Sequence, residues 1–157
     1  MNGLRLKFQK KREEVRKHLG VLERAFRALH EKLGPSFNEE TMERAREDPI
    51  LLPYLDQVAY RFSRLQDSLG DLLRLYLLIK GESVENLPML DLVNLAEKRG
   101  LSVNGERWWH LRRLRNILVH EYPEEDEEVA RALREIESEL SGVRKLLAEM
   151  EDGLSTL

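Results

Sequence analysis

The chain has 157 residues, of which 41% are hydrophobic and 35% charged, so it is long enough to bury the core of one domain. It has no cysteine, which excludes disulfides and thiolate metal sites. Its 26 Lys and Arg against 29 Asp and Glu give a net charge of -3, which argues against broad non-specific binding of nucleic acid. No stretch resembles a signal peptide or approaches the ~18 to 20 apolar residues of a membrane span. We therefore expect one domain over residues 1–157, in a cytoplasmic protein without a membrane partner.

The first predicted helix begins at about Leu4 or Gln9 and ends at Leu33, before Gly34 and Pro35. An apolar stripe at steps of four and three supports it: Val15, Leu19, Leu22, Phe26, Leu29 and Leu33. The first twelve residues are basic. They fit either an arm that contacts RNA or a solvated helix start, and the solvated start is the more typical of such a pattern.

Two further helices are predicted before residue 81. Asn38 is a suitable N-cap for a short polar helix that ends at about Glu47. Pro53 suits the first turn of a second long helix, which runs to Lys80 with Gly81 as its C-cap. The apolar stripe of this long helix predicts that it lies at the centre of the core: Val58, Phe62, Leu65, Leu69, Leu72, Tyr76 and Ile79.

Three helical segments are predicted in the second half of the chain. A short helix opens at Leu87 and Pro88 and ends at about residue 99, and a second runs over about residues 106–121. The last runs over about residues 124–150, on a strict stripe of Val129, Leu133, Ile136, Leu140, Val143, Leu147 and Met150. With no strand signal, the pattern predicts an all-α fold, an antiparallel up-down four-helix bundle with one or two short extra helices.

The stretch at residues 107–122, RWWHLRRLRNILVHEY, concentrates the side chains of chemical interest. Arg115, Asn116, His120 and Tyr122 fall on the last turns of the predicted helix, because Pro123 ends it. The helix dipole at that end favours the imidazolium form and raises the pKa of His120. A cation, an amide, an imidazole and a phenol therefore share one helix end.

This pattern, R-N-x-x-x-H-x-Y, resembles the R-x4-H-x-Y signature of the HEPN superfamily, and most of all its small HepT-like branch, which is encoded beside a minimal nucleotidyltransferase. The likeness covers about residues 50–125, including YRFSRLQD at 60–67 and DLVNLAEK at 91–98. It implies a metal-independent endoribonuclease, the toxin of a toxin–antitoxin pair, with a nucleotidyltransferase antitoxin that modifies Tyr122 with AMP. The alternative is a non-catalytic helical subunit that binds substrate for the nucleotidyltransferase.

In that reading, His120 moves a proton at the attacking 2′-hydroxyl or the leaving oxygen, and Arg115 stabilises the charge that develops on phosphorus. Asn116 either fixes the imidazole or holds a phosphate oxygen. The five-residue spacing turns Arg115 and His120 about 140° apart on an α-helix, so one copy cannot easily aim both at one phosphate. The resemblance implies a composite site in a homodimer.

Purely structural interpretations stay open beside these. His120 would cap carbonyls at a helix end, Arg115 would pair with Glu121 or Glu124, and Tyr122 would close the helix. A metal shared by Glu106 and His110 is less typical than a solvated pair, so we predict neither metal nor cofactor. A local basic patch would give weak RNA contacts, with Trp108 or Trp109 stacking on a base: Arg107, Trp108, Arg112 and Arg113.

Overall fold

A computed structural model describes residues 2–121 and 126–155, which form six α-helices and one π-helical turn, with no strand among them. The elements are α1 (Asn2–Leu33), α2 (Glu39–Glu47), α3 (Leu52–Ile79), α4 (Met89–Lys98), α5 (Gly105–Asn116), η1 (Ile117–Glu121) and α6 (Asp126–Ser155). The all-α prediction is confirmed. No helix in these ranges combines the length and apolar character needed to cross a bilayer.

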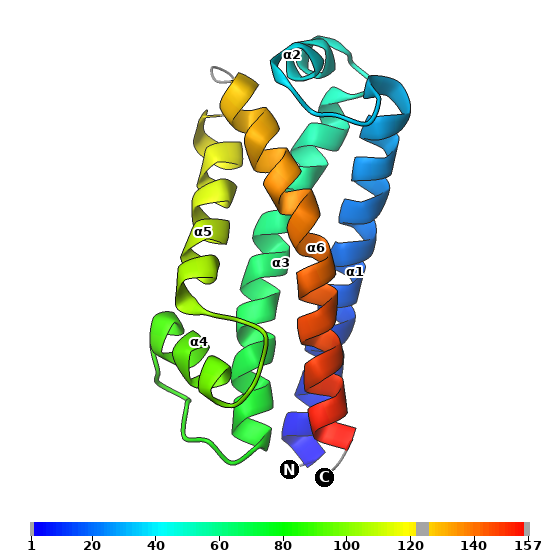
Figure 1. Cartoon of the computed structure of the whole chain (residues 1–157). Coiled ribbons are helices and arrows are strands. Elements are labelled where there is room, and N and C mark those ends of the chain that lie inside the picture. The colour runs from blue at the N-terminus through cyan, green and yellow to red at the C-terminus, as the bar shows by residue number, and fades with distance from the viewer. Residues whose placement is uncertain (1, 122–125, 156–157) are drawn as a thin grey trace.

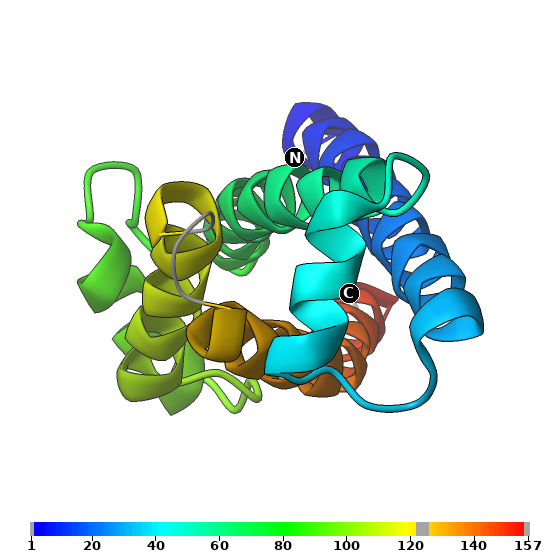
Figure 2. The same ribbon diagram turned by 90° about the horizontal axis from the view of Figure 1, so that it is seen from above.

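The long helices form a bundle in which successive members alternate in direction (Figure 1). α1, α3, α5 and α6 run up, down, up and down, and each lies beside the next in a ring. Seen from above, α2 crosses one end of the ring between α3 and α6 (Figure 2). The other short helix, α4, packs against α3 and α5 at the opposite end. The two short helices therefore occupy the connections of an up-down four-helix bundle.

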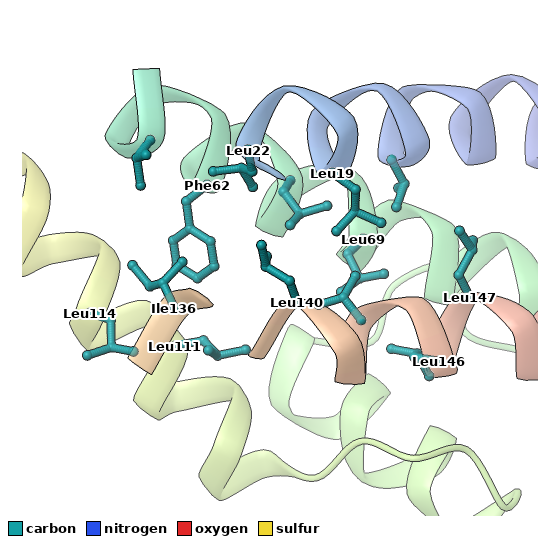
Figure 3. Close-up of a cluster of buried hydrophobic side chains, with 14 of the residues drawn as sticks. Leu19, Leu22, Phe62, Leu69, Leu111, Leu114, Ile136, Leu140, Leu146 and Leu147 are labelled. Carbon is teal, nitrogen blue, oxygen red and sulfur yellow. The ribbon is translucent and has the colours of Figure 1, made fainter. Parts of the chain in front are cut away.

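One hydrophobic core runs through the bundle, and all four long elements contribute to it (Figure 3). Every residue of the predicted stripes of α1, α3 and α6 is buried. Leu22 of α1 lies beside Phe62 of α3 and Leu19 beside Leu69, while Ile136 of α6 and Leu114 of α5 close the other side. Truncating one such side chain to alanine removes about 2 to 5 kcal/mol of stability. The fold therefore depends on this core.

The predicted caps are present at the helix ends. The Asn38 side chain accepts a hydrogen bond from the Thr41 backbone N–H at 2.9 Å, and the Thr41 hydroxyl accepts one from the Asn38 N–H at 2.8 Å. Gly34 and Gly81 follow α1 and α3 with φ of 91°, a conformation that side chains disfavour. Because the caps satisfy the end groups locally, the sequence defines these boundaries to within a few residues.

The helix predicted over residues 106–121 differs from the structure in its last turn. The α-helical part ends at Asn116, and Ile117–Glu121 continue it as a π-helix with i→i+5 hydrogen bonds. Two sequence features favour the wider turn. Ile117 and Val119 are β-branched and crowd the preceding turn of an α-helix. A proline at 123 in a continued α-helix would also collide with the carbonyl of Val119.

Candidate active site

The motif helix α5 divides cleanly into a buried and an exposed side. Trp108, with 4% of its surface exposed, points into the core together with Leu111, Leu114 and Leu118. Trp109 is 50% exposed. Neighbouring residues on an α-helix point about 100° apart, so only one of the two tryptophans faces the core. The proposal of Trp108 as a base-stacking residue is wrong, because its ring fills the core beside Gly70, and Trp109 is the tryptophan available for that role.

Arg115 projects toward α3 and forms an ion pair with Asp67. The Arg115 Nη1 and Asp67 Oδ1 atoms are 3.3 Å apart, and the two side chains are 27% and 60% exposed. This partner lies on a neighbouring helix, because α5 packs against α3 along this edge. The side chain of Glu121 and the whole of Glu124, the other two partners considered for Arg115, lie outside the described residues. A single exposed ion pair contributes at most about 1 kcal/mol, so an incoming phosphate can compete for the guanidinium.

The α-to-π change alters the geometry between Arg115 and His120. The angle of about 140° applies only where 3.6 residues make one turn. In a turn closed by i→i+5 hydrogen bonds, a five-residue step comes closer to a full turn. The backbone positions of Arg115 and His120 are therefore nearer to one face of the helix than an α-helix allows. The argument that Arg115 and His120 of one copy cannot both reach one phosphate is therefore weaker than it is for an α-helix.

The structure describes the other predicted site residues, Asn116, His120 and Tyr122, to different extents. Asn116 is the last residue of α5 and is exposed. The backbone of His120 belongs to η1, while its side chain lies outside the described part of the structure. Tyr122 lies outside the described residues altogether. The structure thus places Arg115 and Asn116 at the junction of α5 and η1.

The other predicted cations of α5 have different surroundings. Arg107 is engaged with Glu139 of α6 in an ion pair. Arg112 lies with its guanidinium carbon 5.9 Å from the centre of the Trp109 ring, a cation–π contact at the surface. Arg113 is exposed, and neither it nor Arg112 has a carboxylate partner within the described residues. Arg112 and Arg113 thus leave part of the surface of α5 basic.

His110 contacts both α6 and its own helix. Its Nε2 is 3.3 Å from Oε2 of Glu135 on α6, and its Nδ1 is 3.4 Å from Nη2 of Arg113. Glu106 is not among these partners. Across residues 2–121 and 126–155, no group of three or more His, Asp or Glu side chains is placed to hold a metal ion.

At the motif end of the bundle, α6 contacts both α2 and η1. Arg46 of α2 donates to both carboxylate oxygens of Asp126, at 2.7 and 2.6 Å, where the described part of α6 begins. Two parallel hydrogen bonds of this kind fix orientation as well as distance. η1 also packs against α6. The start of α6 is therefore held on α2 independently of the motif.

His18 and His30 serve the packing of α1 and take no part in this site. Burial, with the charges of Arg61 and Arg64, lowers the pKa of His18. Arg61 donates to its Nδ1 at 3.2 Å, so His18 is neutral with the proton on Nε2. Sequence periodicity gave no sign of either histidine's role, because each depends on a partner from another helix.

His30 has the opposite character. Its Nδ1 donates to the Gly34 carbonyl at 2.8 Å, and its Nε2 lies 2.9 and 3.0 Å from the two carboxylate oxygens of Glu137. Since both partners only accept, both ring nitrogens carry protons. Burial by itself lowers the pKa of His30, but the bonds to Gly34 and Glu137 outweigh it and raise the pKa. The imidazolium joins α1 to α6.

Comparison with protein-family models, with curated proteins and with solved structures gives no match to this chain. The HEPN resemblance therefore depends on the motif at 115–122 and on the helical segments quoted with it.

Proposed function

We propose that this chain is the toxin subunit of a HEPN/nucleotidyltransferase toxin–antitoxin pair, a cytoplasmic endoribonuclease that needs no metal for the chemical step. The observation that carries the proposal is the position of R-N-x-x-x-H at the change from α-helix to π-helix. π-turns inside helices are rare and are frequently found at functional sites. The motif resembles that of a catalytic family, and the same residues have an unusual backbone. The two observations together support an active site better than either does alone.

The chemistry assigned to the site is transesterification within RNA. The 2′-oxygen attacks the adjacent phosphorus, the bond to the 5′-oxygen breaks, and the products are a 2′,3′-cyclic phosphate and a 5′-hydroxyl. His120 takes the 2′-hydroxyl proton or supplies one to the leaving 5′-oxygen. Arg115 leaves Asp67 and binds the phosphate, where its charge stabilises the phosphorane. The exposed Asn116 amide donates to a phosphate oxygen.

A homodimer is part of this proposal. Trp109 and Val119 on the motif helix are both 50% exposed, and Asn116 lies between them in sequence and is exposed as well. Large apolar side chains beside a polar site favour an interface that buries them against a second copy. Each copy would then bring its Arg115 and His120 to a shared groove. Light scattering at micromolar concentration tests this, and a pure monomer would remove the shared groove.

Tyr122 is proposed as the point of control. Transfer of AMP to its phenol by the nucleotidyltransferase would add a bulky phosphodiester two residues from His120. The added negative charge would compete with RNA phosphate for Arg115 and block the groove without refolding the protein. Intact-mass mapping after incubation with the neighbouring nucleotidyltransferase and ATP tests the assignment. Modification and silencing that persist in Tyr122→Phe would contradict it.

Cleavage of single-stranded RNA by the purified protein in the presence of a chelator tests the enzymatic proposal. The wild type should release fragments that end in a 2′,3′-cyclic phosphate, and Arg115→Ala should lower the rate by at least about a hundredfold, the effect of losing one preorganised charge donor. Arg24→Ala removes an exposed arginine of α1 and is the matched control, which should retain full activity. Equal rates for wild type and Arg115→Ala would reject the mechanism.

One observation favours the non-catalytic alternative, a helical subunit that binds substrate for a nucleotidyltransferase. Asp67 already neutralises Arg115 in the isolated chain. If the pair is permanent, the guanidinium holds α5 against α3 and stabilises no transition state. Asp67→Asn distinguishes the two roles, because freeing Arg115 should raise or preserve cleavage by an enzyme, whereas a binding subunit shows no cleavage before or after the change.

A further inference from the structure

A cavity of about 390 Å³ lies between the first part of α1 and the last part of α3. Its floor is apolar and is formed by Leu75 and Leu78, both half-buried. Charged side chains surround this floor: Lys7, Lys10, Lys11, Arg74, Glu14 and Asp71. We call this cavity the lysine pocket.

The two carboxylates of the lysine pocket are already engaged. Lys11 Nζ lies 3.1 Å from Oε2 of Glu14 and 3.6 Å from Oδ2 of Asp71, so it bridges α1 to α3. Glu14 also accepts a hydrogen bond from the Ser68 hydroxyl at 3.3 Å. The negative charges of Glu14 and Asp71 are therefore largely compensated by contacts within the protein.

Three cations of the pocket lack such a partner. Lys7 and Lys10 are exposed and form no ion pair with any residue in the described ranges. Arg74 Nη1 donates to the carbonyls of Val84 and Leu87, at 2.5 and 2.9 Å, and its charge meets no carboxylate among the described residues. Although the chain has a net charge of -3, the lysine pocket therefore carries uncompensated positive charge.

The lysine pocket and the ion pair of Arg115 both border α3, through residues four positions apart. Asp71 lines the pocket, and Asp67, which holds Arg115, lies one turn away on the same face. From Asp67 to Leu75 the rise along the helix is about 12 Å. A single strand of a few nucleotides can therefore reach Arg115 and the lysine pocket together.

We propose that the lysine pocket is a binding site for the RNA strand that Arg115 and His120 cleave, which rests on the function proposed above. One base would lie on Leu75 and Leu78, where burying its ring removes apolar surface from water. Arg74, fixed by its two carbonyl bonds, offers a planar cation for stacking beside it. Lys7 and Lys10 bind the flanking phosphates.

Binding is measured by fluorescence anisotropy with a labelled single-stranded RNA whose 2′-hydroxyls are methylated, so that it cannot be cleaved. The double variant Lys7→Ala with Lys10→Ala should bind about tenfold more weakly in 0.1 M salt and lower the slope of log affinity against log salt by about 1.4, since each single-strand phosphate contact contributes about 0.7. The matched control is Lys32→Ala with Lys145→Ala, which removes two exposed lysines away from the pocket and should bind as the wild type does.

If both double variants lose RNA affinity equally, the proposed site is rejected, because the loss would reflect only the change in the overall charge of the protein. Unchanged binding in Lys7→Ala with Lys10→Ala would overturn it as well. Competition by ATP as strong as that by unlabelled RNA would assign the pocket to free nucleotides instead. The probe cannot be cleaved, so binding and cleavage are measured separately. If the probe binds through the pocket but ordinary RNA is not cleaved, the ribonuclease proposal is rejected and the binding site is kept. If ordinary RNA is cleaved but binding does not depend on the pocket, the binding site is rejected and the ribonuclease proposal is kept.

Discussion

Compared with α1, α3 and α6, the motif helix α5 is short, and the turn η1 that continues it departs from regular α-geometry. α3 and α6 keep an apolar stripe in the core along their length, and α1 does so from Val15 to Leu33. α5 buries three side chains, those of Trp108, Leu111 and Leu114, and then changes to a π-helix where the motif lies. Its polar residues are held by single ion pairs such as that of Arg115 with Asp67.

The difference separates stability from chemistry along the chain. Side chains that stabilise the fold belong mainly to the long helices, whereas Arg115 is partly exposed and Asn116 exposed at the end of α5. Proteins often place reactive groups on the less stable parts of a rigid scaffold. Substitutions in the two regions should therefore have different consequences, and the following changes test that expectation.

The largest effect is expected from the core of α3. Leu65→Ala should lower the free energy of unfolding by about 2 to 5 kcal/mol, because Leu65 is fully buried and its removal leaves a cavity. Asn116→Ala at the motif should change it by no more than about 0.5 kcal/mol. Urea unfolding measures both. Similar losses for the two variants would show that the motif is part of the structural core.

Two glycines of α6 form a matched pair with opposite expectations. A Cβ at Gly153 would collide with the hydroxyl of the buried Tyr76, so Gly153→Ala should destabilise by about 1 to 3 kcal/mol. A Cβ at Gly142 meets nothing within 4 Å, so Gly142→Ala should stabilise by about 0.5 to 1 kcal/mol. Thermal unfolding of both variants checks the pair, and a loss in Gly142→Ala would show that α6 needs flexibility there.

The smallest effect concerns the pH dependence of stability. The pKa of His30 is higher in the folded than in the unfolded chain, so its contribution is complete below the unfolded value of about 6.5 and is lost as the pH rises through the folded value. His18 has a lowered pKa and acts oppositely, losing stability as the pH falls through its folded value. Glu137→Gln should therefore flatten the decline above about pH 6.5 in chemical unfolding, by less than about 1 kcal/mol. Identical profiles for variant and wild type would contradict the ion pair.

Much of the fold could be predicted because the helices are locally specified. The stripe that runs from Val15 to Leu33 and the caps at Asn38 and Gly34 are local signals, and each fixes an element without knowledge of the rest of the chain. The site was harder to predict. The partner of Arg115 is 48 positions away on α3, and only the packing of α5 on α3 brings the two together.

The π-turn was also missed, for a related reason. The spacing of Trp108, Leu111, Leu114 and Leu118 fits a continuous α-helix, and a change of one residue in hydrogen-bond register leaves no trace in that spacing. The β-branched Ile117 and Val119 were a local sign of strain that periodicity does not use. Burial likewise decided between Trp108 and Trp109 as the exposed ring.

The most direct measurement is made on His120→Ala, with RNA cleavage and thermal unfolding recorded from the same preparation. If the motif is catalytic and carries little of the fold, cleavage should be abolished while the melting temperature stays within a few degrees of the wild type. A variant that unfolds would assign His120 to capping the helix end, and a folded variant that cleaves RNA at the wild-type rate would contradict the account.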